Sequence, residues 1–285
     1  MRARLVVLAT LFVIAACAPR TSGREPARPA AVAPAAAADS LRGPWRVRNP
    51  ARPRAAVVEL RAELRSTIDT LSRTDTVASR TWLEWSSVPG SEPQRLVGMV
   101  RDFAVQTGDD GAWAPVPGLG FPITFAALVD APGEQPRLES PNPAGCDARA
   151  AAVQALRDAW LAPPQALAIG TAWEDSATYT VCRDGVLLRA SGGRGYVVDG
   201  AELRDDRLVL RVLRVSDAQI EGRGVQFGDS VAVTGRSTSQ GMLFLSLDGG
   251  AIVSGNIRSE LRLEMRGRRR TQQLVQDGVL EIRVP

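Results

Sequence analysis

The sequence predicts a mainly β protein of the α+β type: an antiparallel meander of about ten strands forming a curved sheet or a partly open barrel, with one packed amphipathic helix. Three observations predict this fold class. Apolar and polar residues alternate with a period of two in many segments, turn-forming pairs separate these segments, and one segment follows helical spacing. The chain has 285 residues and 45% of them are hydrophobic, so it contains enough apolar mass for one large domain or two ordinary ones.

The clearest strand runs from Val58 to Ile68, where apolar residues alternate with charged ones and predict one wet face. Similar alternation predicts further strands at 77–85, 95–106, 178–188, 196–203, 207–215, 230–236, 242–247, 251–265 and 272–284. Tight turns are expected at Pro89-Gly90, Asp184-Gly185, Asp205-Asp206, Asp248-Gly249-Gly250 and Asp277-Gly278.

Two other segments are interpreted as connections between strands. The glycine-rich segment 189–195 reads as a mobile hairpin loop, and it lacks the lysine that a phosphate-binding loop needs. The arginine-rich run 266–270 reads as a charged hairpin tip, with a polyanion-binding patch as the alternative.

Residues 147–161 break the alternating pattern and follow the spacing of an amphipathic helix of about four turns. Pro163 and Pro164 end it. This helix would separate strands at 57–130 from strands at 165–285, and Phe121 to Phe125 fits either a strand or a short helix.

The N-terminus has the form of a secretory signal, residues 1–16, with a basic start followed by an apolar stretch too short to span a membrane. Ile14-Ala15-Ala16-Cys17 resembles the lipobox of bacterial lipoproteins. The resemblance implies that Cys17 carries acyl chains, that these anchor the protein in the membrane, and that Ala18 directs it to the bacterial outer membrane. An ordinary secreted protein is the alternative.

Residues 17–54 are rich in alanine, proline and arginine and are expected to form an extended tether. The β-rich domain then covers 55–285, as one unit or as two halves, 55–145 and 146–285. The first 54 residues hold ten arginines and two acids, so the other 25 arginines and 29 acids leave the domain slightly acidic. We therefore expect no nucleic-acid partner.

The chain contains neither histidine nor lysine. This excludes histidine-dependent nucleophiles, histidine-ligated zinc, Schiff-base lysines and phosphate-loop lysines. Carboxylate doublets occur at Asp109-Asp110, Glu174-Asp175 and Asp205-Asp206, but neighbours on a strand point to opposite faces and each doublet suits a turn or cap. We expect no catalytic residue, no metal and no cofactor.

Of the three cysteines, Cys17 is assigned to lipidation, which leaves Cys146 and Cys182 as a pair. A disulfide between them is expected in an oxidising compartment, with two free thiols as the alternative. It would close a loop of about 36 residues and stabilise the fold by about 3 to 4 kcal/mol.

Two short segments, Pro164 to Asp175 and Leu245 to Val253, resemble β-rich envelope lipoproteins of unknown function. Lipobox, tether, antiparallel sheet and packed helix are together similar to the unclosed-barrel lipoprotein carriers of the LolA and LppX kind. That resemblance implies an acyl chain held between sheet and helix, but no functional residue here matches theirs. Trp173 is expected to be a core residue.

These observations suggest a non-enzymatic, lipid-anchored envelope protein that binds an apolar ligand, a lipid or a partner protein in a groove between sheet and helix. A carbohydrate-active hydrolase using paired carboxylates is one alternative. A structural scaffold lipoprotein is the other.

Overall fold

The computed structural model describes residues 41, 43–47, 54–87, 90, 95–108, 111–115, 123–128, 137–138, 155, 158–159, 161, 163–164, 166–183, 186–226, 228–247, 252–268 and 270–284. All of them belong to one compact unit, Ala35–Pro285. Within these ranges, no helix has the length and apolar character needed to cross a membrane.

The described part of the chain is built from antiparallel strands, several of which are long enough to curve. The strands are β1 Trp45–Arg46, β2 Arg54–Ile68, β3 Leu71–Ser87, β4 Arg95–Thr107, β5 Ala114–Pro115, β6 Ile123–Leu128, β7 Arg137–Leu138, β8 Ala166–Leu167, β9 Ala172–Arg183, β10 Val186–Arg204, β11 Arg207–Gln226, β12 Asp229–Ser246, β13 Ile252–Gly267 and β14 Thr271–Arg283. The predicted mainly β, antiparallel fold class is therefore confirmed.

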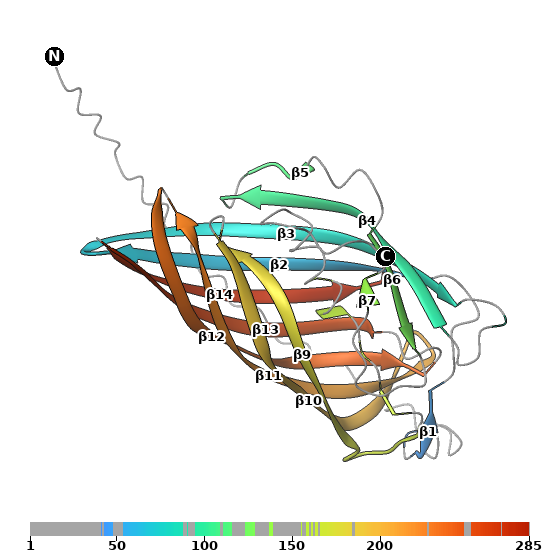
Figure 1. Cartoon of the computed structure of the whole chain (residues 1–285). Coiled ribbons are helices and arrows are strands. Elements are labelled where there is room, and N and C mark those ends of the chain that lie inside the picture. The colour runs from blue at the N-terminus through green and yellow to red at the C-terminus, as the bar shows by residue number, and fades with distance from the viewer. Residues whose placement is uncertain are drawn as a thin grey trace, which may run out of the picture. The chain divides into compact units, whose positions relative to one another are not determined.

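One large sheet has the order β7-β6-β4-β3-β2-β14-β13-β12-β11-β10-β9, with β5 paired to β4, while β1 and β8 form a separate two-stranded sheet. Figure 1 shows that the large sheet is strongly curved, with β9 at one edge. The sheet is open, because its two ends, β9 and β7, do not pair with each other among the described residues. The last strand of the chain, β14, pairs with the first long one, β2, and joins the two halves of the sequence.

The face of the sheet that carries most of the buried residues is called the inner face here. The strand period of two places every second residue on it, as the alternating buried and exposed residues of β10 and β11 show. The main cluster on this face comprises Trp45, Ala56, Val58, Leu83, Val100, Phe103, Ala159, Leu161, Leu167, Trp173, Tyr196, Val198, Leu210, Val212, Leu243, Leu245, Ile252, Ile257, Leu280 and Ile282. The distal cluster comprises Val186, Leu188, Ala190, Ile220, Val231, Val233, Leu263, Met265 and Leu274.

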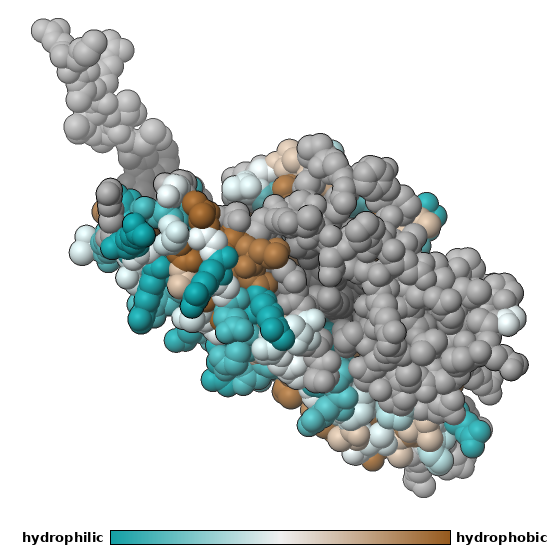
Figure 2. Space-filling view, viewed as in Figure 1, coloured by the Kyte–Doolittle hydropathy of each residue, from teal (hydrophilic) through white to brown (hydrophobic). Residues whose placement is uncertain are grey.

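The opposite, outer face carries many arginine and carboxylate side chains together with exposed apolar residues such as Leu213 and Val215, and both hydrophilic and hydrophobic side chains are seen on the left of Figure 2. Residues two apart on a strand point the same way, so an arginine and an acid at that spacing pair along the strand. One such pair, Arg73–Asp75, lies at the end of β3 on the inner face, where Arg73 is opposite Ser66 and Asp75 is opposite Leu64. Among the described residues, five other pairs lie on the outer face: Arg61–Glu59, Arg65–Glu63, Arg204–Glu202, Arg262–Glu260 and Arg266–Glu264. Most are exposed and contribute little to stability, but they keep this face wet.

Some expected turns are correct and others are wrong. Asp205 and Asp206 form the β10–β11 turn with φ of 47° and 58°, which aspartate tolerates better than most residues. The run 266–270 is a hairpin tip in which the Gly267 amide donates to the Arg270 carbonyl oxygen. Asp277-Gly278, however, lies inside β14, because strand partners on both sides hold it extended.

The interpretation of 189–195 as a hairpin loop is also wrong, since the segment lies in the middle of β10. At Gly192, a Cβ atom would overlap the Asp217 carbonyl oxygen and would lie 2.8 Å from the Ala218 Cβ. The glycine therefore allows two strands to approach closely and does not mark a turn. Likewise, the strands expected at 230–236 and 242–247 are one strand, β12.

Most of the helix expected at 147–161 lies outside the described residues, and the described residues show no packed helix. Within it, Ala155, Asp158 and Ala159 have helical conformation, and Ala159 is buried in the main cluster. The sequence of Phe121 to Phe125 fitted either a strand or a short helix, and part of this segment belongs to strand β6. Trp45, expected in the tether, is instead buried in the main cluster and pairs with Leu167.

Candidate functional site

A polar row crosses the inner face between the two apolar clusters. Asp175 of β9 lies opposite Arg194 of β10, and Arg194 lies opposite Ser216 of β11. The row continues through Ser239 of β12 and Ser259 of β13, each directly opposite its neighbour. Gly278 of β14 and Ala62 of β2 extend it with small residues.

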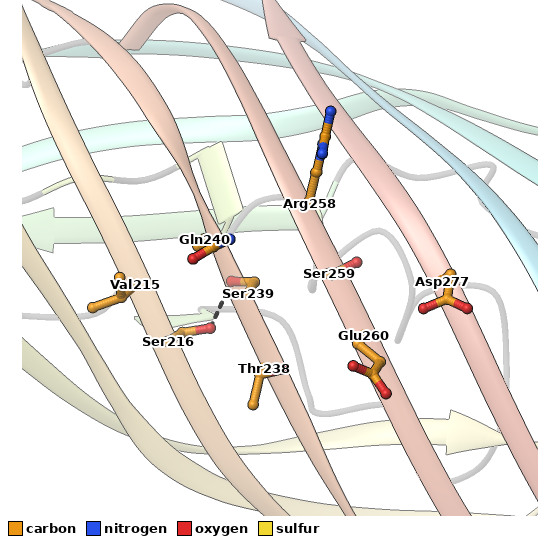
Figure 3. Close-up of a pocket in the computed structure, with 9 residues that line it drawn as sticks. All are labelled: Val215, Ser216, Thr238, Ser239, Gln240, Arg258, Ser259, Glu260 and Asp277. Atoms are coloured by element: carbon orange, nitrogen blue, oxygen red, sulfur yellow. Dashed lines mark hydrogen bonds between the residues drawn. The ribbon is translucent and has the colours of Figure 1, made fainter.

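Ser216, Ser239 and Ser259 are called the serine row. All three side chains are half-buried, whereas the inner-face residues of the main cluster are buried to within a few per cent, for example Val212 at 0% and Leu243 at 1% exposed. The Ser216 and Ser239 hydroxyls lie 2.6 Å apart and are joined by the dashed line in Figure 3. Solvent therefore reaches the inner face at this band of small, uncharged residues.

The β9 end of the row is a buried ion pair. Arg194 donates to both carboxylate oxygens of Asp175, at 2.8 Å from Nε and 2.9 Å from Nη2, and the Tyr196 hydroxyl donates to Oδ2 at 3.0 Å. Burial raises the pKa of the Tyr196 hydroxyl far above its ordinary value, so it stays a donor. Burial alone would lower the pKa of Arg194, but Tyr196 and Asp175 more than offset this and raise it.

A second buried arginine lies one row away. The Nη2 of Arg214 donates to Asp158 Oδ1 at 2.7 Å, which ties helical residue Asp158 to the middle of the sheet. Arg214 lies opposite Tyr196, whose ring stacks on Trp173 with centroids 5.2 Å apart. Trp173 is thus a core residue, as predicted. Two buried nitrogen donors, Arg214 Nε and Trp173 Nε1, have no hydrogen-bond partner among the described atoms.

A separate cavity of about 480 Å³ lies against β11–β14 and is shown in Figure 3. Its lining consists of Val215, Ser216, Thr238, Ser239, Gln240, Arg258, Ser259, Glu260 and Asp277. Six of these nine belong to two adjacent outer rows, and the described residues of the neighbouring inner rows do not line it. The cavity therefore lies mainly on the outer side of the sheet, and Ser216, Ser239 and Ser259 of the serine row also line it.

This outer cavity brings two carboxylates together. Glu260 of β13 lies directly opposite Asp277 of β14. Directly opposed residues in antiparallel strands have Cα atoms about 4.5 to 5.5 Å apart. Glu260 also forms an ion pair with Arg262. The sequence patterns did not single out this pair, because the two acids lie far apart in the chain.

The structure separates the carboxylate doublets noted in the sequence. Glu174 is exposed and Asp175 is buried, as expected for neighbours on a strand, while Asp205 and Asp206 form a turn. Asp109 and Asp110 lie outside the described residues. In the described ranges, no group of three or more cysteine, aspartate or glutamate residues could hold a metal ion.

Cys17 and Cys146 lie outside the described residues. Cys182 lies in β9, opposite Leu187, and its pairing with Cys146 stays a prediction. Sequence reasoning missed Arg194, because the glycines around it suggested a loop. The alternation of Arg194, Tyr196 and Val198 with exposed residues was the signal that placed them on one strand face.

Comparison of the chain with protein-family models gives no match, and no curated protein matches it in sequence.

Proposed function

We propose that this is a non-enzymatic, lipid-anchored protein of the bacterial cell envelope that holds an apolar or amphipathic ligand against the inner face of its sheet. The observation that carries the proposal is the solvent-accessible serine row between two apolar clusters. Ligand sites in proteins combine a mostly apolar surface with a few placed polar groups, and this band has that composition. The helix expected at 147–161 would form the other wall, since Asp158 is tied to the sheet by Arg214.

The anchoring part of the proposal depends on Cys17. Acyl chains on this residue would hold the protein at the outer membrane, and several chains anchor stably where one does not. Metabolic labelling with a palmitate analogue, comparing wild type with Cys17→Ala, tests it. Label on the wild type alone supports anchoring, and an unlabelled, freely soluble wild type contradicts it.

Native mass spectrometry of protein extracted gently from membranes tests the binding part. We expect a bound small molecule on the wild type and its loss in Ser239→Leu, because leucine would fill the accessible band. Thr238→Leu, the neighbouring residue on the outer face, is the matched control and should keep the molecule. A wild type that carries no ligand would favour the structural scaffold, and a bound polypeptide would favour a partner protein.

Carbohydrate hydrolysis is a second candidate, favoured by the opposed Glu260 and Asp277 in the outer cavity. Glycosidases place two carboxyl groups about 5 to 10 Å apart. Release of nitrophenol from a panel of nitrophenyl glycosides, lost in both Glu260→Gln and Asp277→Asn, would support it. Absence of hydrolysis by the wild type, or activity that survives both substitutions, would count against it.

A further inference from the structure

The inner face carries almost no charge. Among the described side chains, β2, β13 and β14 place no charged residue on it, although the same strands carry many on the outer face. β12 places only Asp229 there, at its first position, and β3 places Arg73 and Asp75, which pair with each other. β10 contributes Arg194 and β11 contributes Arg214. Each is ion-paired with an aspartate, Asp175 or Asp158, so the charges of these four residues sum to zero.

This balance determines which polar groups the inner face accepts. An anionic group brought beside two arginines that are already neutralised would be an unpaired charge in a partly desolvated place, which is costly. The side-chain exposures of 5% for Arg214 and 3% for Asp175 show how little water could screen such a charge. A cationic group would meet the same obstacle, since both aspartates are occupied.

Uncharged oxygen-bearing groups, by contrast, find partners along the whole row. Each serine hydroxyl both donates and accepts a hydrogen bond, which suits hydroxyl and ester groups. Ser259 is half-buried, and Gly278 and Ala62 beside it have little or no side chain to cover it. The unpartnered Nε of Arg214 lies two residues before Ser216 on the same inner face and offers one further donor.

We propose that the ligand is a neutral amphiphile whose uncharged hydroxyl or ester group lies over the serine row while its alkyl chain lies against the apolar residues beside the row. This rests on the function proposed above and narrows it to one ligand class. Acylglycerols and alkyl glycosides share this chemistry, whereas fatty acids and phospholipids do not.

Competition in native mass spectrometry tests the charge of the ligand. The full chain in ammonium acetate with a zwitterionic detergent, which is outside the proposed ligand class, is mixed with equal amounts of monooleoylglycerol, oleate and oleoyl lysophosphatidate, which share one acyl chain. We expect the complex with monooleoylglycerol to exceed each anionic complex by about tenfold or more, because an unpaired charge is costly to bury. Equal or greater binding of either anion would overturn the inference and leave the proposed function standing.

Two further measurements test whether the site binds free polyols and whether the serine hydroxyls contribute to binding. Glycerol alone should not compete, and if it displaces monooleoylglycerol the site is one for free polyols and the inference fails. The double variant Ser216→Val with Ser239→Val should lower the monooleoylglycerol signal about tenfold by removing two hydroxyls, and leave oleate unchanged. Thr238→Val on the outer face is its control. Failure of every amphiphile to bind the wild type would overturn the proposed function together with the inference.

Discussion

Removal of the Asp175 carboxylate is expected to be among the most destabilising single changes in this protein. The Asp175 and Arg194 side chains are 3% and 11% exposed, and two hydrogen bonds of 2.8 and 2.9 Å join them. In Asp175→Ala, the buried arginine loses the carboxylate that it binds through two hydrogen bonds, and breaking a buried ion pair in this way typically costs about 3 to 5 kcal/mol. Loss of the acceptor for the Tyr196 hydroxyl adds about 1 kcal/mol.

Arg194 cannot escape by losing its proton, because a guanidinium group stays protonated in proteins. For a domain of this size, each kcal/mol lowers the midpoint of thermal unfolding by about 2 to 4 °C, so the total cost of about 4 to 6 kcal/mol should lower it by about 8 to 24 °C. Circular dichroism on heating measures it. Asp217→Ala is the control, because Asp217 and Arg236 form a similar bidentate pair with side chains 50% and 59% exposed, and the midpoint should not move.

A double variant identifies the cause. Replacing both partners, Asp175→Leu with Arg194→Met, removes the uncompensated charge and should restore most of the lost stability. A double variant as unstable as Asp175→Ala would show that packing, not charge, sets the cost. An Asp175→Ala midpoint equal to that of Asp217→Ala would refute the reasoning altogether.

Three further predictions concern other parts of the fold. Gly192→Ala should destabilise by about 1 to 3 kcal/mol in urea unfolding, because a Cβ there overlaps the neighbouring strand. Gly193→Ala should not, because its Cβ would make only an ordinary contact of 3.5 Å with the Asp175 carbonyl oxygen. Burial alone would raise the pKa of Glu59, but hydrogen bonds and charges from Arg80 and Arg61 lower it by more than burial raises it. The pKa of Glu59 therefore lies below its ordinary value of 4.5. The stabilisation from this ionised side chain is complete above pH 4.5 and is lost as the pH falls through the lower folded pKa. Glu59→Gln should therefore be less stable than wild type at pH 7 and equal to it in strong acid, and a constant difference in urea unfolding across the pH series would contradict this. Cys146 and Cys182 should react with iodoacetamide only after the protein has been both reduced and unfolded, and the mass of the intact protein measures the reaction. Reaction of these two cysteines in unfolded protein that has not been reduced would exclude the disulfide.

Much of the fold was predictable because strand alternation is a local property. The run from Val58 to Ile68 alternates over its whole length and is a single strand, and the Asp205-Asp206 pair forms the turn that its residue types favour. The predicted turn at Asp277-Gly278 was wrong because two flanking strands supply hydrogen bonds that outweigh a local preference. The interpretation of the segment around Gly192 as a loop was wrong for the same reason, because Gly192 allows close approach to a strand that is distant in sequence.

The sequence by itself determined the class of the protein: an antiparallel β fold, a wet face rich in arginine, and a chemistry without histidine or lysine. These follow from composition and from the period of two, which need no knowledge of strand order. Only the tertiary structure decided that Asp175, Arg194 and three serines from separate strands form one row. The physical reason is that register between distant strands depends on the pairing of the whole sheet, including β14 with β2, and no local pattern contains it.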